Sequence, residues 1–147
     1  MFKAIALLTL AFATQGRVRL AAQDSEPYES WMVTGTTRPL SMEWRLQAGQ
    51  YVLHVDTLGG ASTPVAPKWL RVSQISLPTP KSGYHIATEC APADSVANRT
   101  IVAIAQTTNT ELYKNLVQAW RLDLKTLQIN ELRSLTGLQC KNPGWGT

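Results

Sequence analysis

The stretch RTIVAIAQ, residues 99–106, is the most informative part of the sequence for the fold. Five consecutive apolar residues, Ile101 to Ala105, leave this stretch without a polar face. A strand of this kind must be covered on both sides. The stretch also lies between the two cysteines of the chain, Cys90 and Cys140. We therefore expect a central, buried strand in the middle of the domain.

Residues 1–22 have the pattern of a secretory signal peptide. Lys3 supplies one positive charge, and the run from Ala4 to Ala13 is apolar except for one threonine. As a helix, a run of this length spans about 15 Å, which is half of the roughly 30 Å of a bilayer core. No stable membrane anchor is therefore expected, and the predicted location is periplasmic or secreted. Cleavage after Ala22 is favoured, with Ala13 and Gly16 as the alternatives.

The net charge of the chain depends on this segment. The whole chain carries 14 basic and 10 acidic residues, a net charge of +4. Removal of Lys3, Arg17 and Arg19 leaves 11 bases against 10 acids, a net charge of +1. No cluster of Lys and Arg remains that could follow a phosphate backbone, so no nucleic-acid partner is expected.

The remaining residues, 23–147, suffice for a single domain. An even pair of cysteines in an exported chain predicts a disulfide, here between Cys90 and Cys140. Closing a loop of about 50 residues constrains the unfolded chain by roughly 4 kcal/mol in the entropy model. The alternative is two free thiols in a redox or metal site, although their spacing is far from Cys-x-x-Cys.

Alternation of apolar and polar residues predicts antiparallel strands. In 41–47, Met42, Trp44 and Leu46 share one face, and polar residues occupy the other. A link at 48–50 leads to a second alternating segment, so the two read as a hairpin. Across the chain, strands are expected at 31–33, 41–47, 51–58, 69–77, 84–90, 101–106, 116–124 and 127–135.

Residues 109–119 fit two interpretations. Asn109 could cap a helix, and the following apolar residues have helical spacing. The same region also fits a long hairpin that turns at Lys125-Thr126, which is the preferred interpretation. The predicted class is therefore all-β, with one short helix near 109–119 as the alternative. The expected architecture is a small antiparallel sandwich or barrel with one disulfide.

The two histidines are the candidate chemical groups. His54 and Asp56 are two residues apart on one strand face, and His85 and Glu89 share a face in the same way. If the two strands were neighbours, the four side chains could form a metal or polar site. The favoured interpretation is that these residues are polar because the outer faces of strands meet water. The sequence contains no Gly-x-Ser-x-Gly elbow, His-Glu-x-x-His, Walker loop or Cys-x-x-Cys motif, so no catalytic residue and no cofactor are expected, and an enzyme is the weaker class.

Five tryptophans stand at positions 31, 44, 69, 120 and 145. Alternation places Trp44 and Trp120 in the core, whereas it does not assign Trp69 to the core or to the surface. Trp145 lies between glycines near the end of the sequence. It either folds back over the disulfide, which is favoured, or stands exposed as a partner contact.

The C-terminal part of the chain carries a resemblance. Ala119-Trp120-Arg121-Leu122-Asp123, followed by CKNPGWG at 140–146, resembles the end of small exported bacterial proteins of unknown function. In those proteins an Ala-Trp-Arg-x-Asp hairpin is closed by a Cys-x-Asn-x-Gly-aromatic-Gly ending. Here Lys125-Thr126-Leu127 replaces an easier Thr-Gly turn. The resemblance implies a periplasmic location and no activity.

Export, a β pattern and many aromatic residues favour a domain that works by binding. The expected partner is an envelope protein or ligand, including an enzyme that the domain inhibits. The alternatives are a metal-dependent or hydrolytic periplasmic enzyme and a glycan-binding module, in which exposed tryptophans would stack on sugars.

Overall fold

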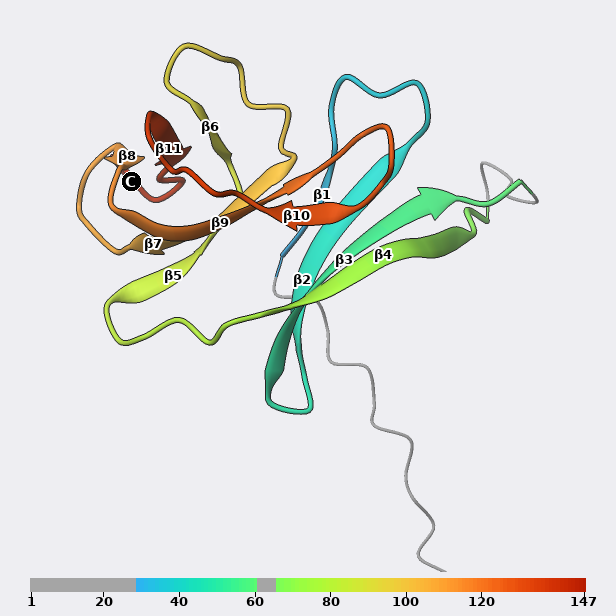
Figure 1. Cartoon of the computed structure of the whole chain (residues 1–147), viewed down its shortest axis with the longest axis horizontal. Helices are drawn as coiled ribbons and strands as arrows, with labels where there is room; N and C mark the ends of the chain where they lie inside the picture. Colours follow the sequence, from blue (N-terminus) through green and yellow to red (C-terminus); the bar gives the residue numbers. More distant parts are fainter. Residues whose placement is uncertain (1–28, 61–65) are drawn as a thin grey trace, which may run out of the picture.

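The computed structural model describes residues 29–60 and 66–147, and Figure 1 shows their arrangement. The predicted signal peptide lies outside the described residues. Eleven strands form three antiparallel sheets, and no helix occurs in the described part of the chain. The predicted all-β class is therefore confirmed. No described segment is a helix long and apolar enough to cross a membrane.

The first sheet contains β1 (Glu29–Met32), β2 (Leu40–Gln47), β3 (Gln50–Leu58) and β4 (Trp69–Leu77), in this order. The predicted hairpin of β2 and β3 is present. Its connection is shorter than expected, because Gln47 pairs with Gln50 and leaves only Ala48 and Gly49 in the turn. Both turn residues have positive φ, 48° and 79°, which is the backbone that matches the right-handed twist of the flanking strands.

The second sheet has the order β10-β9-β7-β5. Its strands are β5 (Tyr84–Ala87), β7 (Ile101–Gln106), β9 (Leu116–Leu122) and β10 (Ile129–Glu131). β9 and β10 form the predicted hairpin, so the helical alternative for 109–119 is wrong. Asp123 closes the turn, because its Oδ1 accepts hydrogen bonds from the backbone N–H groups of Lys125 and Thr126.

The third sheet has the order β6-β11-β8 and contains β6 (Cys90–Pro92), β11 (Leu138–Lys141) and β8 (Leu112–Tyr113). It corrects the predicted strand 84–90. β5 ends at Ala87, and the chain leaves the second sheet before β6 begins at Cys90. The physical reason is that Cys90 pairs directly with Cys140 on β11, so this part of the chain belongs to a different sheet.

β7 lies in the middle of the molecule. Val102 and Ile104 on one face join the core beneath the first sheet, where Met42, Leu53 and Trp120 also lie. On the opposite face, three residues join a second core with the third sheet: Ile101, Ala103 and Ala105. The expectation that this strand is covered on both sides is confirmed. The three sheets thus form three layers with β7 inside the central one.

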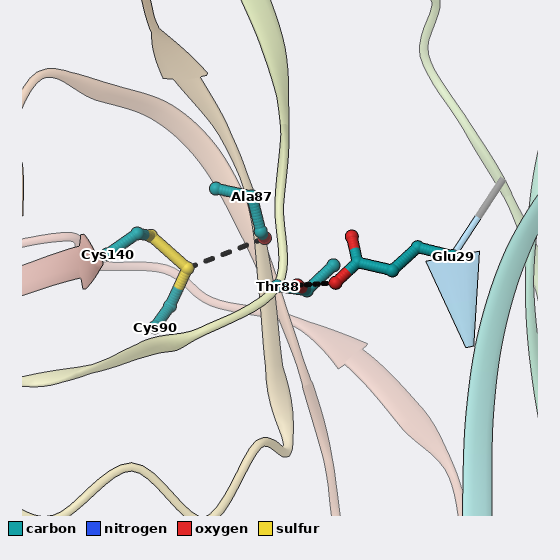
Figure 2. The surroundings of a disulfide bond; sticks show 5 residues. All are labelled: Glu29, Ala87, Thr88, Cys90 and Cys140. Atoms are coloured by element: carbon teal, nitrogen blue, oxygen red, sulfur yellow. Dashed lines mark hydrogen bonds between the residues drawn. A yellow bond between two sulfur atoms is a disulfide. The ribbon is translucent and has the colours of Figure 1, made fainter. Parts of the chain in front are cut away.

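The disulfide joins Cys90 and Cys140 as predicted, with an S–S distance of 2.00 Å. Both residues are fully buried in the second core. In Figure 2 the carbonyl oxygen of Ala87 lies beside it, 3.5 Å from Cys90 Sγ. Close by, the Thr88 hydroxyl donates a hydrogen bond to Glu29 Oε1 at 2.6 Å, which ties β1 to the end of β5. The disulfide indicates an oxidising, extracytoplasmic compartment.

Candidate functional site

His54 and Asp56 belong to a polar network on the outer face of the first sheet. The strand register builds the network, because Glu43 lies opposite His54 and Arg71 lies opposite Asp56. Opposed residues in an antiparallel pair share a face, and residues two apart on one strand do so as well. Arg45, two residues after Glu43, therefore completes the cluster.

A single oxygen atom holds this polar network together. Glu43 Oε1 accepts hydrogen bonds from Arg45 Nη2, from His54 Nδ1 at 3.2 Å and from Arg71 Nη2 at 3.1 Å. Arg71 also binds Asp56 through both oxygens, with Nε–Oδ1 at 3.0 Å and Nη2–Oδ2 at 3.2 Å. The network therefore links the side chains of β2, β3 and β4.

His54 is fully buried although it lies on the outer face of the sheet. The expectation that polar residues on this face meet water is wrong for His54, because its neighbours cover it. Burial is the main cause that lowers the pKa of His54 below 6.5, and nearby Arg71 and Arg45 act in the same direction against the effect of Glu43. A neutral His54 donates from Nδ1, since the Glu43 carboxylate can only accept. The two arginines and two carboxylates around it balance in charge.

His85 and Glu89 line a different feature, a hollow of 140 Å³ beside the third sheet. His85 Nδ1 lies 2.9 Å from the Thr107 hydroxyl. The His85 and Tyr113 rings pack in a T-shaped arrangement with their centroids 4.5 Å apart. Burial lowers the pKa of His85 below 6.5. Glu89 forms an ion pair with Arg99 at 3.7 Å.

The sequence did not identify three other groups that line this hollow: Glu29, Tyr113 and Lys141. They come from β1, β8 and β11, so only the packing of three sheets brings them near His85. No local pattern of residues could have indicated this neighbourhood.

The two predicted histidine pairs lie on different sheets. His54 is on β3 in the first sheet, and His85 is on β5 in the second. Within 29–60 and 66–147, no group of three or more His, Cys, Asp or Glu side chains could hold a metal ion. The four predicted side chains therefore form two separate groups.

The tryptophans divide into a buried and an exposed group. Trp31 and Trp120 are buried. Trp44 packs against the core beneath the first sheet, and the centroids of the Trp44 and Tyr51 rings are 5.8 Å apart. The alternation of the sequence thus placed Trp44 and Trp120 correctly. Trp69 and Trp145 are exposed, to 39% and 48%. For Trp145 the exposed arrangement is present rather than the favoured burial.

The turn that carries Trp145 is fixed by one side chain, that of Asn142. Its Nδ2 donates to the carbonyl oxygens of Thr110 at 2.9 Å and Thr108 at 3.4 Å. Its Oδ1 accepts from the backbone N–H of Gly144 at 3.0 Å. The backbone N–H of Trp145 in turn donates to the Asn142 carbonyl oxygen at 3.2 Å. The tail is therefore held against the loop between β7 and β8.

Comparisons with protein-family models, with curated proteins and with solved structures found no match for this chain.

Proposed function

We propose that this domain works in the periplasm or outside the cell by binding an envelope protein, with Trp145 as a central contact. One observation carries the proposal: a large aromatic side chain stands exposed on a turn whose backbone is held by the hydrogen bonds of Asn142. Tryptophan is among the residues that contribute most to protein–protein interfaces.

The fixed turn favours binding because association costs ordering entropy. Immobilising a side chain or loop at an interface costs about 0.5–1.5 kcal/mol for each flexible side chain. Asn142 lowers this cost for the backbone around Trp145, since its hydrogen bonds already hold the turn in one conformation. The disulfide supports the same region, because Cys140 anchors β11 two residues before Asn142.

The hollow beside His85 supports a protein partner over a larger ligand. Pro143, two residues before Trp145, is part of its lining, so the hollow lies next to the turn that carries the exposed tryptophan. Its volume of 140 Å³ is well below the roughly 300–1,000 Å³ of pockets that enclose small-molecule ligands. It suits one side chain of a partner whose surface also covers Trp145.

A site-specific photo-crosslink tests this proposal. Trp145 is replaced by a benzoylphenylalanine, and the exported protein is irradiated in its native extracytoplasmic fraction. The matched control carries the same photoreactive residue at Val96, which is 94% exposed in the loop after β6. We expect a discrete adduct from position 145 that position 96 does not form.

Competition makes the test specific for the tryptophan. An excess of unlabelled wild-type protein should abolish the adduct, whereas an excess of the Trp145→Ala variant should compete at least tenfold less well. Equal competition by the two proteins, or the same adducts from both positions, would count against Trp145 as the contact.

A further inference from the structure

The first sheet ends in an open edge at β4. This strand of nine residues pairs with β3 along one side, and among the described strands none pairs with its other side. In Figure 1 it lies at the outside of the first sheet. The backbone N–H and C=O groups along such an edge can pair with a further strand.

β4 lacks most of the features that protect edge strands. Natural edges are short, carry lysine or proline, or contain a bulge. β4 contains no proline and no lysine, and its one charged side chain, Arg71, is bound by Asp56 and Glu43 on the sheet face. The register shifts once, at Val55/Asp56 on β3, where Val72 is the extra residue on β4. Ser73 to Leu77 continue in regular register.

Apolar side chains are concentrated at the first half of β4. Eight large apolar residues are exposed in the described part of the chain, and three of them are Trp69, Leu70 and Val72, at 39–44% exposure. The other exposed apolar residues of that set are farther apart in the sequence. Exposed apolar residues next to an open edge favour a contact that covers both.

We propose that a second copy of this chain pairs with β4, antiparallel to it, and so continues the first sheet across two protomers. Charge is the reason for choosing a second copy. Since Arg71 is neutralised within its own protomer, two β4 edges meet without repulsion, and the edge offers no charge by which to select a charged partner strand. The predicted mature chain carries a net charge of only +1, so the whole molecules repel one another weakly.

A two-fold axis between the two β4 strands lets the backbone groups of both copies pair along the regular stretch Ser73 to Leu77. In an antiparallel pair of identical edges, each free donor of one strand faces a free acceptor of the other. The same pairing also covers the exposed apolar side chains of the two strands, Trp69, Leu70 and Val72. This surface differs from the Trp145 turn, which lies on the connection after β11.

Sedimentation equilibrium tests the proposal on the exported, disulfide-bonded protein. The wild type is expected to reach twice the monomer mass as its concentration rises from micromolar to millimolar. The Val72→Lys/Gln74→Lys variant adds two charges to the edge and should keep the monomer mass over the same range. The matched control, Val117→Lys/Leu124→Lys, adds the same charge at two other exposed apolar residues and should dimerise as the wild type does.

Hydrogen exchange of the wild type provides a second measurement that does not depend on the folding of a variant. Amides of β4 should exchange more slowly as concentration rises, while those of the edge strand β1 should not change. The Trp145→Ala variant should still dimerise, which separates this proposal from the proposed function. A wild type that stays monomeric, including one that instead binds a strand of another protein, overturns the proposal. Dimerisation that survives the two lysines on β4, or that is lost in the control, overturns it as well.

Discussion

At the scale of single residues, the outer face of the first sheet shows how neighbours can change the role of a side chain. His54 occupies a position that alternation assigns to the solvent side, yet Glu43, Arg45 and Arg71 surround it. Three donors share the single oxygen Glu43 Oε1, so no member of the network acts alone. This arrangement is more consistent with a structural role for His54 than with an accessible base.

The histidines make stability depend on pH. Burial lowers the pKa of both His54 and His85 in the folded protein below 6.5, the value they have when unfolded. The unfolded chain therefore binds more protons than the folded chain as pH falls through 6.5. We expect the free energy of unfolding to be highest above pH 6.5 and to fall as the pH is lowered from 7.5 to 5.

Urea denaturation across this pH range measures the effect, and NMR titration of the two imidazole rings provides the residue-specific control. Carboxylates contribute little within this window, because their usual pKa values lie near 4. A free energy of unfolding that stayed constant or rose towards pH 5 would contradict the prediction, as would a ring that titrates above 6.5.

At the scale of single elements, β7 and the β2–β3 turn show two ways in which local sequence sets local structure. The large side chains of Val102 and Ile104 fill the core under the first sheet, while small Ala103 and Ala105 let the third sheet approach from the opposite side. In the turn, Ala48 adopts φ 48°, a left-handed conformation that is unfavourable for a residue with a Cβ atom.

Replacing Ala48 by asparagine should stabilise the hairpin. Asparagine tolerates the left-handed region, and Asn-Gly is the preferred pair for a two-residue turn of this kind. We expect the free energy of unfolding to rise by about 0.5–1 kcal/mol, since Ala48 is exposed and has no packing to lose. Urea denaturation at constant pH measures the change.

Ala48→Val is the matched control for the turn. A β-branched residue is strained at positive φ, so this variant should be less stable than the wild type. If asparagine and valine shifted the unfolding midpoint in the same direction, the conformation of the turn would not be the cause.

At the scale of the whole molecule, the disulfide decides how three layers stay together. It joins two residues that are 50 positions apart, and the chain between them contains β7 and β9. It also holds the third sheet against the face of the second sheet that carries Ala103 and Ala105. The third sheet consists of three strands of two to four residues, and strands of this length have little stability of their own.

The double variant Cys90→Ala/Cys140→Ala should lose about 2–5 kcal/mol of unfolding free energy, the usual cost of removing a disulfide from a small exported domain. Alanine keeps the buried site apolar. The decrease in the free energy of unfolding is therefore caused by the missing covalent bond and by a small cavity. Urea denaturation of the variant and of the oxidised wild type gives the difference. A loss below 1 kcal/mol would contradict the role assigned to this bond.

Hydrogen exchange can locate the weakened part of the same variant. Amides of β6, β8 and β11 should lose protection first, while those of β2 and β3 keep theirs. Uniform loss of protection throughout the chain would indicate that the disulfide supports the whole fold rather than the third sheet.

Local sequence patterns predicted most strands of the first two sheets, the two hairpins and the disulfide, but not the short strands β6, β8 and β11 of the third sheet. Alternation, turn residues and an even number of cysteines are local or countable features, so β2, β3 and the doubly covered β7 could be predicted from them. Packing of the three sheets is needed to explain the break between β5 and β6, the burial of His54 and the assembly of the hollow beside His85. Each of these depends on which strands become neighbours, and side chains far apart in the sequence meet only after the three sheets have packed.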